Sequence, residues 1–232
     1  MKIGLLGYGK MGQLIEVLGA AQGDAVVARM QRHTEWNEEC LERLQQADIL
    51  IDFSEGASVL KHAELSIKLQ KNLIIGTTGW EKDFFEVKTK IEHSNIGCLF
   101  SPNFSLGILI FHEIVRKAAQ LIYRYGGYAV GGVEYHRANK QDAPSGTAKA
   151  LQELVKGEMP DSPQFEFSSV RCGNIPGTHT LLFSSTSDTI TLTHEAHHQE
   201  GFARGALLAA KWLIGKKGFF TLADLLTIQE TH

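Results

Sequence analysis

Residues 2–23, KIGLLGYGKMGQLIEVLGAAQG, decide the fold. The apolar run Lys2–Leu6 is typical of a buried strand, and apolar residues at helical spacing follow from Gln13 onward. Between them lies the hexapeptide 7–12, a GxGxxG turn whose glycines let the backbone approach a pyrophosphate at the helix N-terminus. This order of strand, glycine turn and helix predicts dinucleotide binding, and the alternative is a purely structural turn.

The next segment bears on which dinucleotide is bound. A second strand is predicted at Asp24–Ala28, and its end is where a protein specific for NAD places an acidic residue against the ribose 2′-hydroxyl. Arg29 and Arg32 stand there instead, with only Met30 and Gln31 between them. Two cations favour a 2′-phosphate, and hence NADPH over NADH, unless both arginines are only solvated surface residues.

Apolar strands continue to alternate with helical patterns as far as residue 105. The predicted helices are 34–46, 57–70 and 84–92, and the predicted strands are 48–53, 72–75 and 96–100. This alternation predicts a Rossmann-like, doubly wound parallel sheet. Small and polar residues follow three of the strands, at 54–56, 76–79 and 101–105, on the sheet edge where ligands bind in such folds.

The pattern changes after residue 105. A long helix is expected at 106–124, a strand at 129–135 and a helix from Gly146, followed by strands at 165–171, 179–184 and 189–194. Consecutive strands with one polar face predict an α+β domain with a mixed or antiparallel sheet, whose far face would pack against another subunit. A helix at 201–214 and a short helix or turn at 222–228 end the chain.

Residues that can bind an anion or exchange a proton are concentrated in the segment 134–148, EYHRANKQDAPSGTA. Ser145 is a good helix N-cap, and the N–H groups of Gly146 and Thr147 would then face an anion. His136 and Lys140 just before them can exchange protons near neutral pH. A small ligand with more than one carboxylate fits this loop, and the alternative is a surface loop that happens to be basic.

A second motif is misleading. His194-Glu195-Ala196-His197-His198 matches the zinc-protease pattern HExxH. That pattern binds zinc only on a helix, whereas TITLTHE alternates as a strand and would separate the histidines by roughly 13 Å. We therefore expect no metal there.

The amino-acid composition of the chain bears on which kinds of partner it binds. Of 232 residues, 43% are apolar and 21% charged, and a net charge of −3 gives no reason to expect a nucleic-acid partner. Cys40, Cys98 and Cys172 are few and widely spaced, as reduced thiols are. No apolar run approaches the roughly 20 residues that span a bilayer, and no signal-peptide pattern is present, so we expect a soluble, cytoplasmic protein that does not bind membranes.

Several motifs together resemble the dihydrodipicolinate reductase family. The resemblance rests on GYGKMG at 7–12, DFS at 52–54, GTTG at 76–79, SPNFS at 101–105 and EYHRANKQDAPSGTA, and it extends through RCGNIPGTH at 171–179 and FARGALLAAKWLIG at 202–215. It implies NADPH- or NADH-dependent reduction of the cyclic imine derived from 4-hydroxy-tetrahydrodipicolinate to tetrahydrodipicolinate, in lysine and diaminopimelate biosynthesis. It also implies a homotetramer, a dinucleotide-binding domain of residues 1–104 and 201–232, and a substrate-binding and oligomerisation domain of residues 105–200.

The resemblance also implies residue roles. His136 and Lys140 would be catalytic, with Lys140, Ser145, Gly146 and Thr147 binding the dicarboxylate substrate. Arg137 stands where the family usually has a second histidine; its guanidinium can bind a carboxylate but cannot shuttle a proton. The cofactor-binding residues would be Gly7, Tyr8, Gly9, Lys10, Met11, Gly12, Arg29, Arg32, Phe53, Gly76, Thr77, Thr78, Ser101, Pro102, Asn103 and Phe104.

Two other functions remain open. Another small-acid NAD(P) oxidoreductase, similar to aspartate dehydrogenase, would keep the fold and change the substrate, but Lys140 with DAPSGTA argues against it. A non-catalytic dinucleotide sensor would have lost its proton-handling residues, whereas His136 and Lys140 are present.

Overall fold

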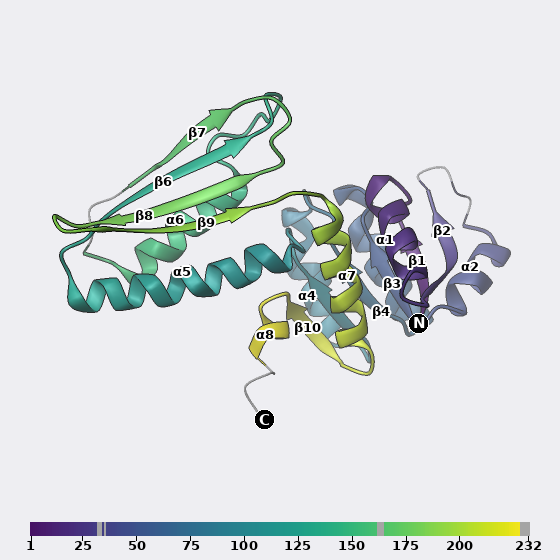
Figure 1. Cartoon of the computed structure of the whole chain (residues 1–232). Helices are drawn as coiled ribbons and strands as arrows, with labels where there is room; N and C mark the ends of the chain where they lie inside the picture. Colours follow the sequence, from purple (N-terminus) through teal and green to yellow (C-terminus); the bar gives the residue numbers. More distant parts are fainter. Residues whose placement is uncertain (32–33, 35, 162–164, 228–232) are drawn as a thin grey trace. The chain divides into compact units, whose positions relative to one another are not determined.

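A computed structural model describes residues 1–31, 34, 36–161 and 165–227 (Figure 1). The chain divides into two compact units, the first built from Met1–Ser105 with the segment that starts at Glu200, and the second from Leu106–Gln199. None of the described helices is both long enough and apolar enough to cross a bilayer.

The first unit is a six-stranded parallel sheet in the order β10-β5-β4-β3-β1-β2. Its strands are β1 (Lys2–Leu6), β2 (Ala25–Met30), β3 (Ile49–Asp52), β4 (Asn72–Ile75), β5 (Gly97–Phe100) and β10 (Gly218–Thr221). Its helices are α1 (Lys10–Ala20), α2 (Glu38–Gln45), α3 (Val59–Leu69), α4 (Phe84–Glu92), α7 (Glu200–Leu213) and α8 (Asp224–Thr227), with 3₁₀ turns η1 (Gly56–Ser58) and η2 (Glu81–Asp83). The predicted doubly wound parallel sheet is confirmed.

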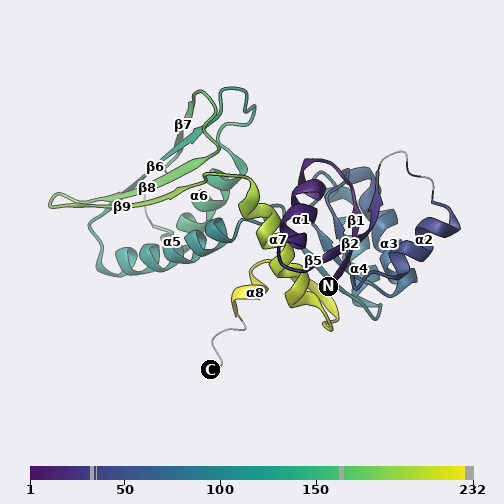
Figure 2. The same ribbon diagram turned by 45° about the vertical axis from the view of Figure 1, so that its right-hand side comes forward.

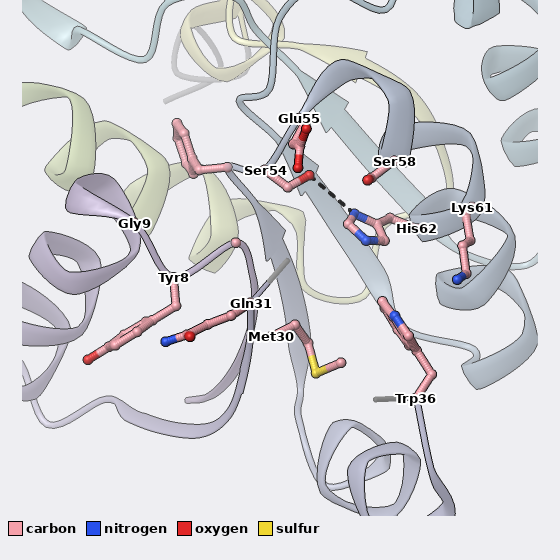
Figure 3. Close-up of a pocket in the computed structure, with 12 residues that line it drawn as sticks. Tyr8, Gly9, Met30, Gln31, Trp36, Ser54, Glu55, Ser58, Lys61 and His62 are labelled. Atoms are coloured by element: carbon pink, nitrogen blue, oxygen red, sulfur yellow. Dashed lines mark hydrogen bonds between the residues drawn. The ribbon is translucent and has the colours of Figure 1, made fainter. Parts of the chain in front are cut away.

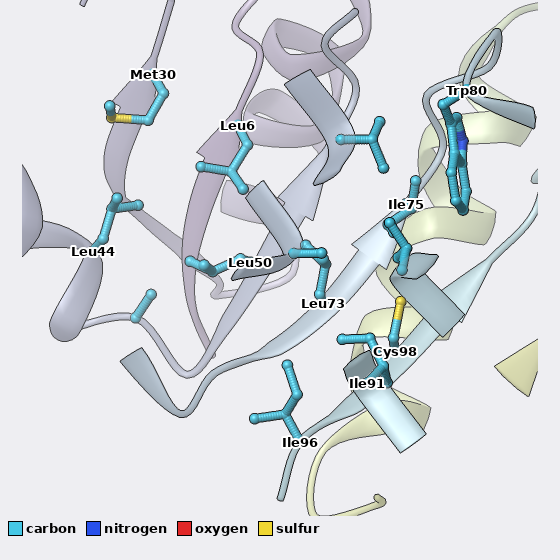
Figure 4. Packing of buried hydrophobic residues seen from close by; sticks show 14 of the residues in the cluster. Leu6, Met30, Leu44, Leu50, Leu73, Ile75, Trp80, Ile91, Ile96 and Cys98 are labelled. Carbon is cyan, nitrogen blue, oxygen red and sulfur yellow. The ribbon is translucent and has the colours of Figure 1, made fainter. Parts of the chain in front are cut away.

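Helices cover both faces of this sheet, which explains its near-continuous apolar strands. Helices α1 and α7 lie together on one face, and α2, α3 and α4 pack on the other (Figures 1 and 2). The core under α2 to α4 contains fully buried Leu50 and Leu73, with Leu44 from α2 and Ile91 from α4 (Figure 4). A side chain on Gly4 of β1 would meet Leu50 at 2.6 Å, so the glycine is what lets this layer pack closely.

At the edges of this sheet, one predicted strand ends at a different residue and one strand was not predicted. Strand β2 runs to Met30 rather than ending at Ala28, because Ala28 and Met30 are both buried and Arg29 between them is exposed. Strand β10 was not predicted, and it pairs in parallel with β5. The predicted short helix near the end of the chain corresponds to α8, which begins at Asp224.

The second unit is a four-stranded mixed sheet in the order β7-β6-β8-β9. Its strands are β6 (Ala129–His136), β7 (Phe167–Arg171), β8 (Thr178–Ser184) and β9 (Thr189–Glu195). Helix α5 (Leu106–Tyr125) precedes β6, and α6 (Gly146–Glu158) connects β6 to β7. The pair β6 and β7 is parallel, and the other pairs are antiparallel. This confirms the predicted mixed sheet.

Helices α5 and α6 cover one face of the second sheet with an apolar cluster that includes Val115, Leu151, Leu181 and Phe183. Alternate residues point to the other face, where the register partners Tyr135 and Val170 are each 38% exposed. One apolar and partly exposed face therefore remains on this sheet.

The HExxH segment lies where the alternation predicted. His194 and Glu195 belong to β9, and His197 follows the end of the strand. The His194 ring packs against Phe111 of α5, with ring centroids 5.8 Å apart. The motif does not have the helical geometry that a zinc protease needs.

Candidate functional site

Two glycines of the turn in the first unit, Gly7 and Gly12, leave no room for a side chain. Gly7 has φ +100°, and a Cβ on it would lie 2.4 Å from the carbonyl oxygen of Phe53. A Cβ on Gly12 would lie 2.5 Å from the carbonyl oxygen of Gly7. Helix α1 starts at Lys10 without a side-chain cap at Gly9, so its first N–H groups are free for a phosphate. The turn therefore fits a pyrophosphate.

A cavity of about 490 Å³ adjoins this turn (Figure 3). Its volume is in the range of small-ligand sites. Four of its lining residues were predicted from the sequence, namely Gly7, Tyr8, Gly9 and Phe53. The others are Met30, Gln31, Trp36, Ser54, Glu55, Ser58, Lys61 and His62.

Trp36, Lys61 and His62 give the cavity an aromatic and cationic wall that the sequence did not reveal. The Lys61 ammonium lies 5.0 Å from the centroid of the Trp36 ring, and the His62 ring is 5.5 Å from it. An aromatic ring beside the Lys61 ammonium suits a nucleobase carrying a phosphate.

A buried carboxylate holds this wall in place. Asp52 is fully buried at the end of β3, and its Oδ2 lies 2.8 Å from His62 Nδ1. Its Oδ1 accepts hydrogen bonds from Thr77 Oγ1 at 2.8 Å and from the Ser54 N–H at 2.9 Å. Asp52 thus ties the ends of β3 and β4 together and orients His62 toward the cavity.

The remaining predicted cofactor residues lie at the same sheet edge but outside the lining of this cavity. A Cβ on Gly76 would meet the Phe53 ring at 2.2 Å, and the Phe53 and Phe104 ring centroids are 5.8 Å apart. The described residues in this group are Lys10, Met11, Gly12, Arg29, Gly76, Thr77, Thr78, Ser101, Pro102, Asn103 and Phe104. The loops after β3, β4 and β5 therefore meet around Phe53.

Arg29 already has an acidic partner. Its guanidinium pairs with Glu16 of α1, with Nε 3.0 Å from Oε2, and lies 5.7 Å from the centroid of the Tyr8 ring. The hydrogen bond from Arg29 lowers the pKa of Glu16. Arg32, the other predicted cation, lies outside the described residues.

In the second unit, β6 places Glu134 and His136 on the helix-covered face, because residues two apart in a strand share a face. Both side chains are buried, with residue exposures of 0% and 9%. The chain then turns through Lys140 to Ser145, whose hydroxyl accepts the N–H of Ala148 at the start of α6. The predicted N-cap is confirmed.

Glu134 is the centre of this region. Its Oε1 accepts hydrogen bonds from the Ser145 N–H at 3.0 Å, the Ser169 hydroxyl at 2.7 Å and Arg171 Nη2 at 2.9 Å. Burial raises the pKa of Glu134, but these hydrogen bonds outweigh it and lower the pKa to about 2. Glu134 is therefore a buried anion.

Two histidines face this anion. His136 Nε2 lies 3.4 Å from Glu134 Oε2 and 3.4 Å from Nε2 of His179, which in turn lies 3.1 Å from the Ser145 hydroxyl. Burial lowers the pKa of both histidines, and it lowers that of His179 to about 4. The negative charge of Glu134 raises the pKa of His136 and so opposes part of this effect. The His179 Nδ1 atom is buried without a hydrogen-bond partner among the described residues.

Two of the more exposed residues of the loop after β6 lie outside the contacts of Glu134 and pair with one another. Lys140 Nζ lies 2.6 Å from Asp142 Oδ1, and this contact lowers the pKa of Asp142. The Gly146 N–H also contributes a hydrogen bond to that carboxylate. Asp142 thus occupies two groups that were predicted to bind substrate, while Arg137 is exposed.

Glu134, His136 and His179 could also be considered as metal ligands, since their ligand atoms lie within 4.8 Å of one another. However, both oxygens of Glu134 already accept hydrogen bonds, and the guanidinium of Arg171 opposes a second cation beside it. We assign this cluster no metal.

Comparison with known proteins covers both units. Residues 1–104 match the family model "Dihydrodipicolinate reductase, N-terminus", and residues 107–226 match "Dihydrodipicolinate reductase, C-terminus". The 4-hydroxy-tetrahydrodipicolinate reductase of Christiangramia forsetii is 33% identical over 237 residues, covering 98% of each chain. That of Buchnera aphidicola subsp. Acyrthosiphon pisum is 35% identical over 200 residues, covering 78% of this chain and 73% of its own.

A solved structure shows the same fold. The dipicolinate-bound dihydrodipicolinate reductase from Paenisporosarcina sp. TG-14 superimposes with a TM-score of 0.82, at 21% sequence identity, covering 97% of this chain and 99% of its own.

Proposed function

The chain belongs to the dihydrodipicolinate reductase family, and from this premise we infer that it is an NAD(P)H-dependent 4-hydroxy-tetrahydrodipicolinate reductase. It acts at the reductase step of lysine and diaminopimelate biosynthesis. The observation that carries this conclusion is the joint match of both halves of the chain, with a relative aligned over 98% of its length. The family assignment predicted from the sequence motifs is confirmed.

We propose that the first unit binds the nicotinamide cofactor, which supplies a hydride when bound. The crowded glycines at 7 and 12 and the uncapped start of α1 would hold its pyrophosphate, and the cavity beside Trp36 would hold its adenosine. Gly76–Thr78 and Ser101–Phe104 would contact the nicotinamide and its ribose. Phe53 supports both assignments, because it lines the cavity and packs on Gly76 and Phe104.

We propose further that NADPH is preferred to NADH, with Arg29 and Arg32 providing positive charge near the 2′-phosphate. Gln31, between these arginines, lines the cavity, and the Arg29 side chain is 43% exposed. The ion pair with Glu16 weakens the contribution of Arg29, because it already neutralises the guanidinium.

In the second unit we assign the dicarboxylate substrate to the loop after β6 and the start of α6. The N–H groups of Gly146 and Thr147 would bind one carboxylate, with Ser145 fixing the helix start. Lys140 would donate a proton once the substrate replaces Asp142 as its partner, and His136 would exchange protons. Arg137 is exposed and can bind a second carboxylate.

We also propose a cytoplasmic homotetramer. The apolar residues on the open face of the second sheet, Tyr135 and Val170 among them, support assembly through that face. The three free cysteines support a reducing compartment. Light scattering during size-exclusion chromatography measures the assembly, and a monomer would contradict it.

The function is tested by following oxidation of NADPH and NADH with enzymatically generated substrate. We expect turnover by the wild type and a loss of kcat of about 10²-fold or more in Lys140→Ala, since a general acid contributes that much. Cofactor affinity should be nearly unchanged in this variant. Turnover of aspartate instead would favour the other oxidoreductase, and cofactor binding without turnover would favour a sensor.

A further inference from the structure

Glu134 contacts both parts of the substrate-side site at once. One of its oxygens accepts the Ser145 N–H at 3.0 Å, and the other lies 3.4 Å from His136 Nε2. The carboxylate therefore joins the histidine at the end of β6 to the helix start that presents Gly146 and Thr147. His179 belongs to the same network of contacts, because its Nε2 lies 3.1 Å from the Ser145 hydroxyl and 3.4 Å from His136 Nε2.

We propose that Glu134 is a positioning residue for the reduction: it orients the His136 ring and fixes the N-terminus of α6 relative to that ring. Because the roles of His136 and α6 are part of the proposed function, this inference rests on that function. Glu134 itself is fully buried and has no direct access to a substrate.

A charged and firmly held residue suits this role. Burying a carboxylate is costly unless it is fully hydrogen-bonded, and Glu134 receives hydrogen bonds from Ser145, Ser169 and Arg171. Arg171 also donates to the carbonyl of Asp142 at 2.6 Å, so the same network anchors the loop between Lys140 and Ser145. A carboxylate needed only to neutralise Arg171 would not have to face two histidines.

The charges around His136 come from several elements. Glu134 favours its protonated form, whereas Lys140 of the loop and Arg171 of β7 disfavour it, and His179 of β8 lies beside it. The ring also engages the carbonyl of Pro176, and its Cε1 lies against Gly177, where a Cβ would meet it at 2.9 Å. The ring is thus fixed from two sides, and the carboxylate of Glu134 faces it at 3.4 Å.

Glu134→Gln tests the proposal in the full-length protein, because it keeps the shape of the side chain and removes the charge. Glu158→Gln is the matched control. Glu158 lies in the same unit, is also paired with an arginine, Arg116 at 3.1 Å, and makes none of the described contacts to the loop. The first readout is the pKa of His136 measured by NMR on protein with ¹³C-labelled histidine, which does not require turnover.

We expect Glu134→Gln to lower the pKa of His136 by at least about one unit, since an opposite charge at this distance shifts a pKa by one to three units. The same variant should lower kcat by about 10-fold or more, displace the pH profile toward acid and leave the Kd for NADPH within about twofold. Glu158→Gln should change none of these quantities.

Unchanged His136 titration and kcat in folded Glu134→Gln would overturn the proposal. If that variant does not fold, Glu134→Asp is used instead, because the shorter side chain keeps the negative charge but moves it away from the His136 ring. An unchanged kcat in Glu134→Asp would also overturn the proposal. Absence of turnover in the wild type would instead refute the proposed function, while the titration of His136 would still decide whether Glu134 controls the ring.

Discussion

Replacing Glu134 by glutamine should make the stability of the second unit less sensitive to acid. The native hydrogen bonds hold the pKa of Glu134 at about 2, against an ordinary value of 4.5. At about 1.4 kcal/mol per pKa unit, this difference corresponds to roughly 3 kcal/mol of stability. Because the pKa is depressed in the folded state, the contribution is complete above about pH 5 and is lost as the pH falls toward 2.

The assay must report on the second unit alone. All three tryptophans, Trp36, Trp80 and Trp212, belong to the first unit, so their fluorescence serves as an internal control. Urea unfolding followed by hydrogen–deuterium exchange in peptides from β6 and β8 gives the free energy of unfolding of the second unit. We expect Glu134→Gln to lower this free energy by roughly 3 kcal/mol at pH 6, and the difference from wild type to shrink as the pH approaches 2.

Comparing Glu134→Gln with the wild type at each pH cancels the contribution that the other carboxyl groups make to the free energy of unfolding, and Glu158→Gln serves as the control variant. Glu158→Gln disrupts a partly exposed ion pair, so we expect it to cost under about 1 kcal/mol at any pH. A difference between Glu134→Gln and wild type that stays constant from pH 6 to pH 2.5 would refute the linkage argument.

Three further predictions concern the ligand sites. Glu16→Gln frees the guanidinium of Arg29 and should raise the affinity for NADPH several-fold while leaving that for NADH unchanged; equal changes in titrations of the two cofactors would exclude contact with the 2′-phosphate. Gly76→Ala places a methyl group 2.2 Å from the Phe53 ring and should weaken cofactor binding about 10-fold, as measured by calorimetry. An unchanged affinity would mean that Phe53 does not form part of the cofactor pocket. Asp142→Asn removes the carboxylate that occupies the substrate-side loop and should lower the KM for the dicarboxylate substrate a few-fold, whereas a higher KM would mean that Asp142 assists substrate binding.

Periodicity predicted most of the fold because both sheets bury apolar residues at regular spacing. Strand β10 was not predicted because three of its four residues are only partly buried and the fourth, Thr221, is exposed. Its partner strand, β5, also lies more than a hundred residues earlier in the chain. The end of β2 was placed too early, although the alternation of buried Ala28, exposed Arg29 and buried Met30 continues the strand. That error had moved Arg29 into a loop, whereas the strand directs it to Glu16.

The ligand-binding loops were predictable only in part. Glycines and the N-cap Ser145 mark backbone geometry that few other residues can adopt, so their positions were informative. Trp36, Lys61 and His62 come from a loop and a helix start, and no local pattern shows which of their side chains face the cavity. Glu134 could have been found, because it shares a strand face with His136 two residues later.

The order in which the first unit is assembled follows from its discontinuous chain. Its sheet is completed at the β5 edge by β10, and the helix α7 that covers it also comes after the entire second unit. During synthesis, the nascent sheet must therefore remain on the order of ten seconds or longer with one strand edge exposed and with the part of one apolar face that α7 covers exposed as well. A chain truncated near residue 199 would keep this exposed state permanently, so its expected fate is aggregation or capture by chaperones rather than partial activity.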